Sequence, residues 1–200
     1  MTRIILRLSL FILLLSLTTL SAQNRDEERL VRLIRANRAE TIESETLDKK
    51  LVSGNAQFLH NGALIVCDTA IWNVTENTVD ASRNVKIIQD ENILTSDRIL
   101  YIADSSLIKV RGDLVELIDK DSSLLRTKYL NYNTKDSVAY FFNGGSMKDT
   151  TGNIIESIHG YYDSKIKRFR FLESVNMYTQ EMLIKSDSLT YFANDNYTIF

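Results

Sequence analysis

The side chains that could do chemistry in this chain are few and do not combine into a reactive group. The 200 residues include one cysteine, Cys67, and two histidines, of which His60 stands in the turn-like HNG and His159 stands apart from it. The sequence has no nucleophile, base and acid in a known catalytic order, no phosphate loop and no metal-ligand spacing. We therefore expect a protein without catalytic residues, metal ion or cofactor, in which Cys67 is a small buried side chain.

Aspartates that recur at regular intervals raise the possibility of a calcium ladder. Asp68, Asp97 and Asp187 occupy corresponding positions in similar segments, but Lys128 and Ile158 take the same position in two others. A metal ladder would be broken at both places. Hydrogen bonding by aspartate in turns explains the series better.

The first residues have the pattern of a secretory signal. Arg3 and Arg7 precede an apolar run that begins at Leu8, and small residues follow up to Ala22. The apolar stretch Leu8–Leu20 is only 13 residues long, whereas a membrane span needs about 20. The pattern predicts that residues 1–22 are a signal peptide cleaved after Ala22 and that the protein is exported to the periplasm.

The charge of the remaining chain excludes nucleic acid as a partner. Residues 23–200 retain 22 basic and 26 acidic side chains, because the two arginines of the signal are removed, so the net charge is −4. The basic residues are scattered rather than gathered into a patch. A content of 44% hydrophobic residues is ordinary for a folded domain.

Residues 23–45 differ in character from the rest of the mature chain. The stretch RDEERLVRLIRANRAE, Arg25 to Glu40, is highly charged and carries Leu30, Leu33 and Ile34 at helical spacing. This spacing predicts a short amphipathic helix. From residue 46 onward, short runs rich in Val, Ile, Tyr, Phe and Thr alternate with turn residues, which predicts strands over residues 46–200.

The strand-rich region contains a repeat of about 30 residues. Each unit has a run that ends in an aromatic residue, and these aromatics are 29, 31, 30 and 29 residues apart. They are Trp72, Tyr101, Tyr132, Tyr162 and Tyr191. Such regular spacing over five units predicts five similar pairs of strands.

Further positions of the repeat agree when the units are aligned on the aromatic. Seven residues before it the residue is aliphatic: Ile65, Leu94, Leu125, Ile155 and Ile184. Five residues before it the residue is small: Cys67, Ser96, Thr127, Ser157 and Ser186. Four of the five residues at position minus two, and all five at plus nine, are apolar: Ala70, Ile99, Leu130, Gly160 and Leu189, then Ala81, Val110, Phe141, Phe171 and Phe200. A turn residue leads into an apolar strand start between units, as in GNA at Gly54 and RNV at Arg83.

The inward-facing pattern changes phase within each unit. Positions minus seven and minus five share one face of a strand, whereas minus two and zero are out of step with them. A bend or bulge is therefore expected at the polar column between them, the series of Asp68, Asp97, Lys128, Ile158 and Asp187. A bend in every unit predicts an elongated all-β body in which one sheet folds over itself and leaves unpaired edges at both ends.

The order of these motifs resembles a known family. The stretches GNAQFLHNGALIVCDTAIWN and RNVKIIQDENILTSDRILYIADSSLIKVRGD, followed by LRTKYLNYNTKDSVAYFFNGG and GYYDSKIKRFRF, are similar to the OstA-like, LptA-type proteins of lipopolysaccharide transport. They look like the version found in Bacteroidota. The resemblance covers about residues 46 to 200 and depends on the order and spacing of the motifs.

The resemblance implies a twisted β-jellyroll with a V-shaped, lipid-lined groove. Its implied task is to shield the acyl chains of lipopolysaccharide between the inner and outer membranes. The implied partners are lipid A acyl chains, membrane components at each end, and further jellyroll proteins or copies of itself joined by edge-strand addition. The apolar residues expected to line the groove are Ile65, Leu94, Ile99, Ile108, Val110, Val115, Leu117, Leu125, Leu130, Phe141, Ile155, Phe169 and Phe171. The same residues would also suit the packed core of any β-sandwich.

Two departures from the family pattern leave other interpretations open. Ile158 and His159 replace the acidic anchor in the fourth unit, and the sequence stops at Phe200, nine residues after Tyr191, the aromatic of the fifth unit. We expect from this that the sequence is a fragment of a longer chain. A structural or adhesive β-repeat protein of the cell surface, or the periplasmic part of an outer-membrane assembly protein, would share these features. The basic stretch KIKRFR, Lys165–Arg170, predicts an alternating strand whose outward charges are solvated or contact lipid phosphates.

Overall fold

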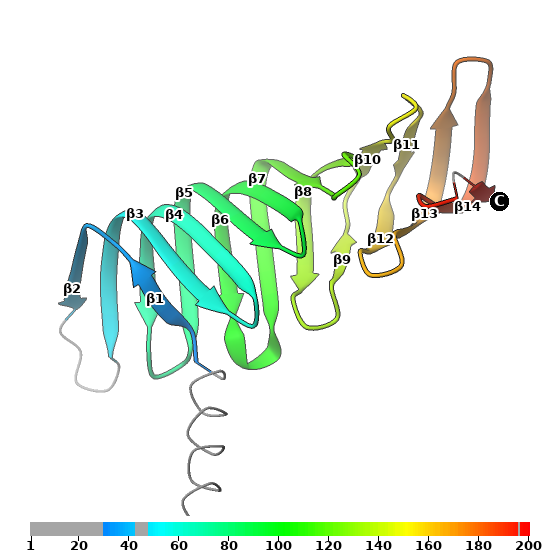
Figure 1. Ribbon diagram of the computed structural model, residues 1–200. Helices are drawn as coiled ribbons and strands as arrows, with labels where there is room; N and C mark the ends of the chain where they lie inside the picture. The colour runs from blue at the N-terminus through cyan, green and yellow to red at the C-terminus, as the bar shows by residue number, and fades with distance from the viewer. Residues whose placement is uncertain (1–29, 43–47, 196) are drawn as a thin grey trace, which may run out of the picture.

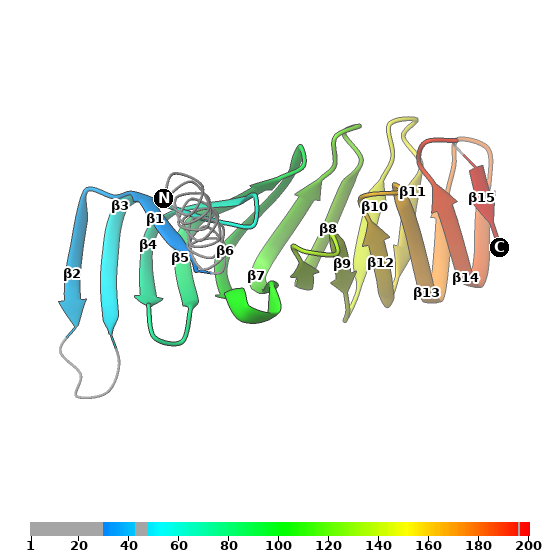
Figure 2. The same ribbon diagram turned by 60° about the horizontal axis from the view of Figure 1, so that its bottom comes forward.

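The strands of the protein form one long antiparallel sheet. A computed structural model describes residues 30–42, 48–195 and 197–200, so the predicted signal peptide and the boundary between residues 45 and 46 lie outside the described residues. Within that part, the sheet has 15 strands, which lie side by side from β2 at one end to β15 at the other (Figures 1 and 2). The elongated all-β fold is as predicted.

The strand bounds show the repeat directly. Most strands have ten to twelve residues, and consecutive strands pair as hairpins throughout the first three units. The strands are β1 (Arg32–Arg35), β2 (Arg38–Ile42), β3 (Lys49–His60), β4 (Ala63–Asn73), β5 (Thr78–Gln89), β6 (Asn92–Ile102), β7 (Leu107–Ile118), β8 (Leu124–Asn133), β9 (Val138–Phe141), β10 (Gly145–Lys148), β11 (Ile154–Ser157), β12 (His159–Asp163), β13 (Arg168–Tyr178), β14 (Leu183–Phe192) and β15 (Tyr197–Ile199).

The predicted N-terminal helix is wrong over the part of it that the structure describes. Strands β1 and β2 occupy most of residues 32–42, and both pair with β3, for example Arg32 with Leu59. Val31 is buried and Leu33 packs against the core. The helical spacing of apolar residues was overridden because pairing with the exposed edge of β3 satisfies the backbone and buries these side chains.

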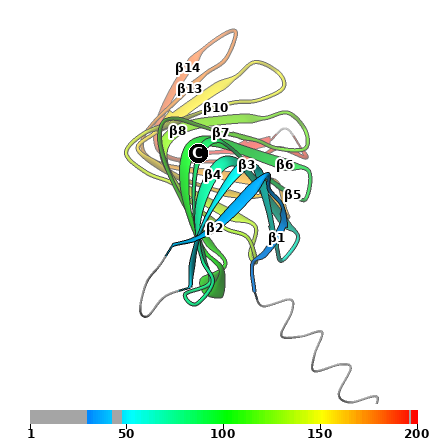
Figure 3. The same cartoon turned by 90° about the vertical axis from the view of Figure 1, so that its left-hand side faces the viewer.

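Each long strand bends once, and the bends align into a corner that runs along the molecule (Figure 3). The register between neighbouring strands shifts at this corner in the pairs from β3 to β8 and between β13 and β14. In β4 the shift separates Ala63–Cys67 from Thr69–Asn73. We call the half of the sheet that contains Ala63–Cys67 the first wall and the half that contains Thr69–Asn73 the second wall.

The bends are β-bulges at the predicted column. In three units two residues of one strand oppose one residue of the column on the next: Gly54 and Asn55 opposite Asp68, Arg83 and Asn84 opposite Asp97, and Glu173 and Ser174 opposite Asp187. All six bulged residues have positive φ, from 50° to 81°. An extra residue in the left-handed region turns a strand sharply, which is how the flat repeat becomes two facing walls. The bend prediction is confirmed.

The fourth unit differs because the corner interrupts the strands completely. Strand β8 pairs with β9 in the second wall and with β10 in the first, and β11 and β12 are likewise separated at Ile158. Strand β13 then spans both walls again, pairing with β11 and β12. The departure noticed in the sequence at Ile158 is therefore a break in the strand.

Candidate functional site

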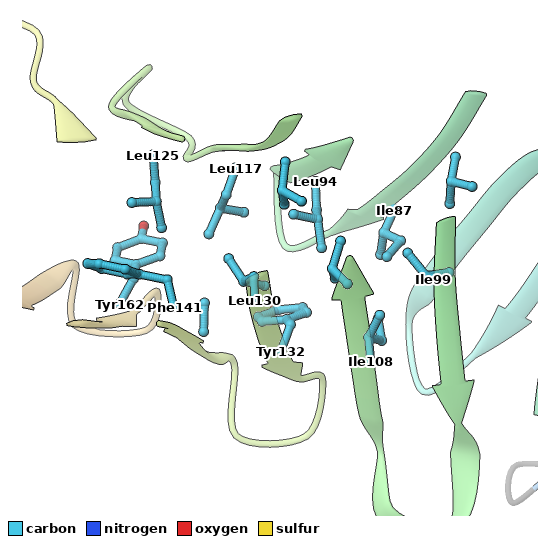
Figure 4. Close-up of a cluster of buried hydrophobic side chains, with 14 of the residues drawn as sticks. Ile87, Leu94, Ile99, Ile108, Leu117, Leu125, Leu130, Tyr132, Phe141 and Tyr162 are labelled. Atoms are coloured by element: carbon cyan, nitrogen blue, oxygen red, sulfur yellow. The ribbon is translucent and has the colours of Figure 1, made fainter. Parts of the chain in front are cut away.

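The space between the two walls contains every residue that was predicted to line a groove. All thirteen are buried, with exposed fractions of 0 to 3%. Side chains from the first wall, such as Leu94, Leu117 and Leu125, face those of the second wall, such as Ile108, Leu130 and Phe141 (Figure 4). The repeat thus brings apolar residues that are far apart in the sequence into one continuous interior.

This interior is closed in the structure. The lining residues belong to a single hydrophobic cluster that extends from Val31 and Val52 near one end to Leu189 and Tyr191 near the other. Because the side chains of the two walls pack against one another, the expected V-shaped groove is filled by its own lining. Whether the same residues contact lipid stays a prediction.

Aromatic side chains fill the part of the interior around unit four. The rings of Tyr162 and Phe169 stack with centroids 4.1 Å apart, and Phe171 lies 6.1 Å from both Phe169 and Phe141. A Cβ atom at Gly160 would lie only 2.2 Å from the Phe141 ring. The glycine in the minus-two column is therefore explained by this ring, which occupies the space that an aliphatic side chain fills in other units.

The column of small residues closes the corner. The hydroxyl of Ser96 donates to the carbonyl of Arg98 at 2.9 Å and accepts from the Arg98 amide at 3.1 Å. Thr127, Ser157 and Ser186 donate in the same way to the carbonyl two residues further on. These bonds satisfy backbone groups that the bulge leaves without a ladder partner.

Cys67 takes the same position in the first unit. It is buried and free, as predicted for a small filler. Burial raises the pKa of its thiol to about 11, and the neighbouring charge of Asp68 acts in the same direction. A thiol with so high a pKa is unreactive near neutral pH.

The tips of the two walls meet at the side of the molecule opposite the corner, which we call the mouth. Here His60, at a first-wall tip, hydrogen-bonds through Nδ1 to the hydroxyl of Tyr101 on the second wall. Gln89, at the next first-wall tip, donates to the carbonyl of Thr134 at 2.7 Å. The Tyr162 hydroxyl donates to Oδ2 of Asp119 at 3.2 Å. We call each such cross-wall contact a rung.

The rungs follow the repeat. On the first wall, His60, Gln89 and Asp119 occupy corresponding hairpin tips, and Asp149 lies at the next tip. Three of the five aromatic anchors face one of these tips: Tyr101 faces His60, Tyr162 faces Asp119 and Tyr191 faces Asp149. Besides burial, the charge of Asp149 helps to raise the pKa of the Tyr191 phenol. An ion pair between Lys167 and Asp121 lies beside the Asp119 rung. Sequence reasoning missed these contacts, although polar residues recur at the tips with the period of the repeat.

Burial and nearby carboxylates keep the anchor tyrosines neutral. Burial raises the pKa of Tyr132 to about 12, with a further contribution from the charge of Asp90, and raises that of Tyr191 to about 12, with a contribution from Asp149. Burial, the charge of Asp119 and the hydrogen bond to it together raise the pKa of Tyr162. The pKa of Asp119 is itself raised by burial, although its hydrogen bonds oppose the change. The mouth is therefore a seam of buried polar side chains.

The basic stretch Lys165–Arg170 is an alternating strand only in its second half, because residues 165–167 lie in the turn before β13 and Lys167 pairs with Asp121. In β13 Phe169 is buried, and Arg168 and Arg170 on either side of it are exposed. Across residues 30–42, 48–195 and 197–200, no cluster of His, Cys, Asp and Glu could hold a metal ion. No helix in the same residues is long and apolar enough to cross a membrane.

The fold and its interior define a class of protein, the antiparallel sheet folded into a jellyroll around a long apolar core. A family profile described as OstA-like protein matches residues 28–187. The chain belongs to this OstA-like family. No curated protein matches its sequence. Among solved structures, LptH, the LptA-homologous periplasmic component of the lipopolysaccharide transport device of Pseudomonas aeruginosa, is similar with a TM-score of 0.49. It is 13% identical over 76% of this chain and 96% of that one.

Proposed function

We propose that the protein is a periplasmic, non-enzymatic carrier that shields the acyl chains of lipopolysaccharide between the inner and outer membranes. The observation that carries the proposal is the continuous apolar interior between two walls. Transfer of each methylene group from water into such an interior is favourable by roughly 0.8 kcal/mol. Membership of the OstA-like family supports the same function.

The ends of the sheet support association by strand addition. Strand β15 has only three residues and pairs with β14 alone in the described part of the chain, and Tyr197 and Ile199 on it are exposed. At the same end Met182, Leu183 and Phe200 are more than half exposed. An apolar edge with unpaired backbone groups suits another jellyroll strand, whether that strand belongs to the same chain, to a further copy or to a membrane component.

The closed interior favours a second candidate, a structural or adhesive β-repeat protein that encloses no ligand. In such a protein the walls would stay packed together, as they are in the structure. Protease treatment of intact cells separates the two candidates. A surface protein is released by the protease, whereas a periplasmic carrier is protected by the outer membrane.

A photo-crosslinker tests the carrier directly. We expect a benzoylphenylalanine at position 94 or 141, in place of Leu94 or Phe141, to capture lipopolysaccharide in living cells, because both side chains point into the interior. The capture is measured by a shift of the protein band that an antibody to lipopolysaccharide recognises.

Lys109 provides the matched control. Lys109 is exposed on β7, between the buried Ile108 and Val110. A crosslinker at this position samples the outer surface at a similar place along the length of the sheet. We expect no capture at this position. Equal labelling at positions 94, 109 and 141 would contradict an interior path for the lipid.

A further inference from the structure

We propose that the row of rungs is a latch that holds the mouth closed in the empty protein, and that acyl chains enter sideways between the tips as rungs open. The chemical nature of the ligand rests on the proposed function. The latch itself rests on the geometry of the described residues.

The first step of the argument is that only side chains join the walls across the mouth. Every strand pairing in the described sheet joins neighbours along its length, and the walls share backbone only at the corner. At the mouth the links include the His60–Tyr101, Gln89–Thr134 and Asp119–Tyr162 contacts and the Lys167–Asp121 ion pair. At the β1 end the backbone amide of Val31 also donates to the side chain of Asn77, at 2.9 Å. The tips can therefore part without breaking the sheet.

The second step concerns what separation of the walls would cost. Acyl chains that enter the interior replace contacts between apolar side chains by contacts between side chains and lipid, so the apolar surface stays out of water. The rungs have no such replacement, since an acyl chain cannot accept the hydrogen bond of the Tyr162 hydroxyl or donate to Asp119. The rungs are therefore the specific barrier to sideways uptake.

The third step is that the latch is divided into units. The Asp119 carboxylate also accepts hydrogen bonds from the backbone amides of Asp121 and Ser123 in its own hairpin, at 3.0 and 2.8 Å. These bonds hold the carboxylate ready when Tyr162 leaves. A rung can then open and close again locally, so that a lipid can move along the interior while the rungs behind it close.

The Tyr162→Phe variant tests the latch, because it removes the rung hydroxyl and keeps the buried ring. Spin labels on cysteines at positions 120 and 166, on the tips joined by the Lys167–Asp121 ion pair, report the width of the mouth. Cys67 is replaced by serine, the residue that three other units have at this position. We expect one short distance in the parent protein and an added longer distance in the variant, without any ligand.

Tyr161→Phe is the matched control. Tyr161 is the neighbouring residue, lies on the outer surface and is 42% exposed, so its hydroxyl belongs to no rung. The control should show the parent's single distance. An identical distance distribution in Tyr162→Phe and in the parent would overturn the latch.

Uptake of cis-parinaric acid, a fluorescent fatty acid, distinguishes the latch from the proposed function. We expect Tyr162→Phe to bind this probe roughly tenfold faster than the parent and than Tyr161→Phe. Loss of a hydrogen bond to a charged group changes the ratio of the open to the closed mouth by about tenfold. Binding at equal rates would overturn the latch and leave the carrier intact. Failure of every protein to bind the probe would contradict the carrier, whereas the label distances would still decide the latch.

Discussion

At the scale of single residues, Phe141 shows how one side chain fixes the identity of others. Its ring fills the interior where the fourth unit is broken, and two glycines make room for it. A Cβ atom would come within 2.4 Å of the ring at Gly145 and within 2.2 Å at Gly160, where the backbone carbonyl of Arg170 is also only 2.8 Å away. Movement of the Phe141 ring alone would not make room for a Cβ atom at position 160, because the Arg170 carbonyl would still be too close.

Gly160→Ala should therefore destabilise the protein. We expect a loss of about 1–3 kcal/mol in the free energy of unfolding, the usual cost of overpacking a core, measured by urea denaturation. Gly112→Ala is the control, because a Cβ atom there meets its nearest neighbour at an ordinary 3.6 Å. Equal stability of the two variants would show that the Phe141 site is looser than the structure indicates.

Single residues also mark the limit of prediction from the sequence. The buried state of Cys67 and the thirteen lining positions could be predicted, because the repeat aligns them with other small or apolar residues. The rung between His60 and Tyr101 could not, since its partners are 41 residues apart and meet only after the walls have folded over. Which hairpin tip faces which anchor depends on how far the two walls are offset along the molecule, and this offset cannot be predicted from the period of the repeat.

At the scale of elements, the corner is the feature that turns a repeat into an enclosure. The change of phase in the apolar pattern predicted where each strand bends, because side chains alternate strictly in an unbroken strand. The N-terminal helix was predicted wrongly by the same kind of pattern. A few apolar residues in a short charged stretch fit several spacings, and pairing with β3 decides between them.

The corner hydroxyls should contribute measurably to stability. Replacing Ser96 by alanine removes a hydrogen bond to the Arg98 carbonyl and one from its amide, and leaves both backbone groups at a partly buried bulge. We expect a loss of about 1–3 kcal/mol in the free energy of unfolding.

Ser146 on β10 offers a comparison for this variant. It lies in a strand rather than at the corner, and its alanine variant should change the free energy by less than about 0.5 kcal/mol. If Ser96→Ala is as stable as Ser146→Ala, the bulge holds its shape by backbone conformation alone. Both free energies are obtained from the same urea titrations.

At the scale of the whole molecule, the two walls are joined by continuous backbone at the corner and by side-chain contacts at the mouth. The elongated shape and the single sheet follow from the repeat, because each unit can bury its apolar face only against its neighbours. The mouth is closed in part by the hydroxyls of two anchors, Tyr101 and Tyr162, and the phenols of Tyr132 and Tyr191 are buried in the same interior. These buried phenols give the entire fold a dependence on alkaline pH.

The sign of that dependence follows from the raised pKa values. An unfolded tyrosine ionises near pH 10, whereas Tyr132 and Tyr191 keep their protons in the folded protein up to about pH 12. Below pH 10 both states are neutral and the stability is fully present. Between about pH 10 and 12 the unfolded state loses protons that the folded state retains, so the free energy of unfolding falls as the pH rises.

The unfolding midpoint in urea should therefore stay level from pH 7 to pH 9 and fall steeply above pH 10. Tyr132→Phe should make this fall shallower by up to about 2 kcal/mol, because the residue no longer ionises in the unfolded state. Tyr161→Phe should leave the slope unchanged, since Tyr161 lies exposed on the outer surface and its replacement removes no buried hydroxyl. The comparison isolates the buried anchor from the general effect of losing lysine charges in the same pH range. A slope that Tyr132→Phe does not alter would mean that water reaches the anchor in the folded protein and that the mouth stands open in solution.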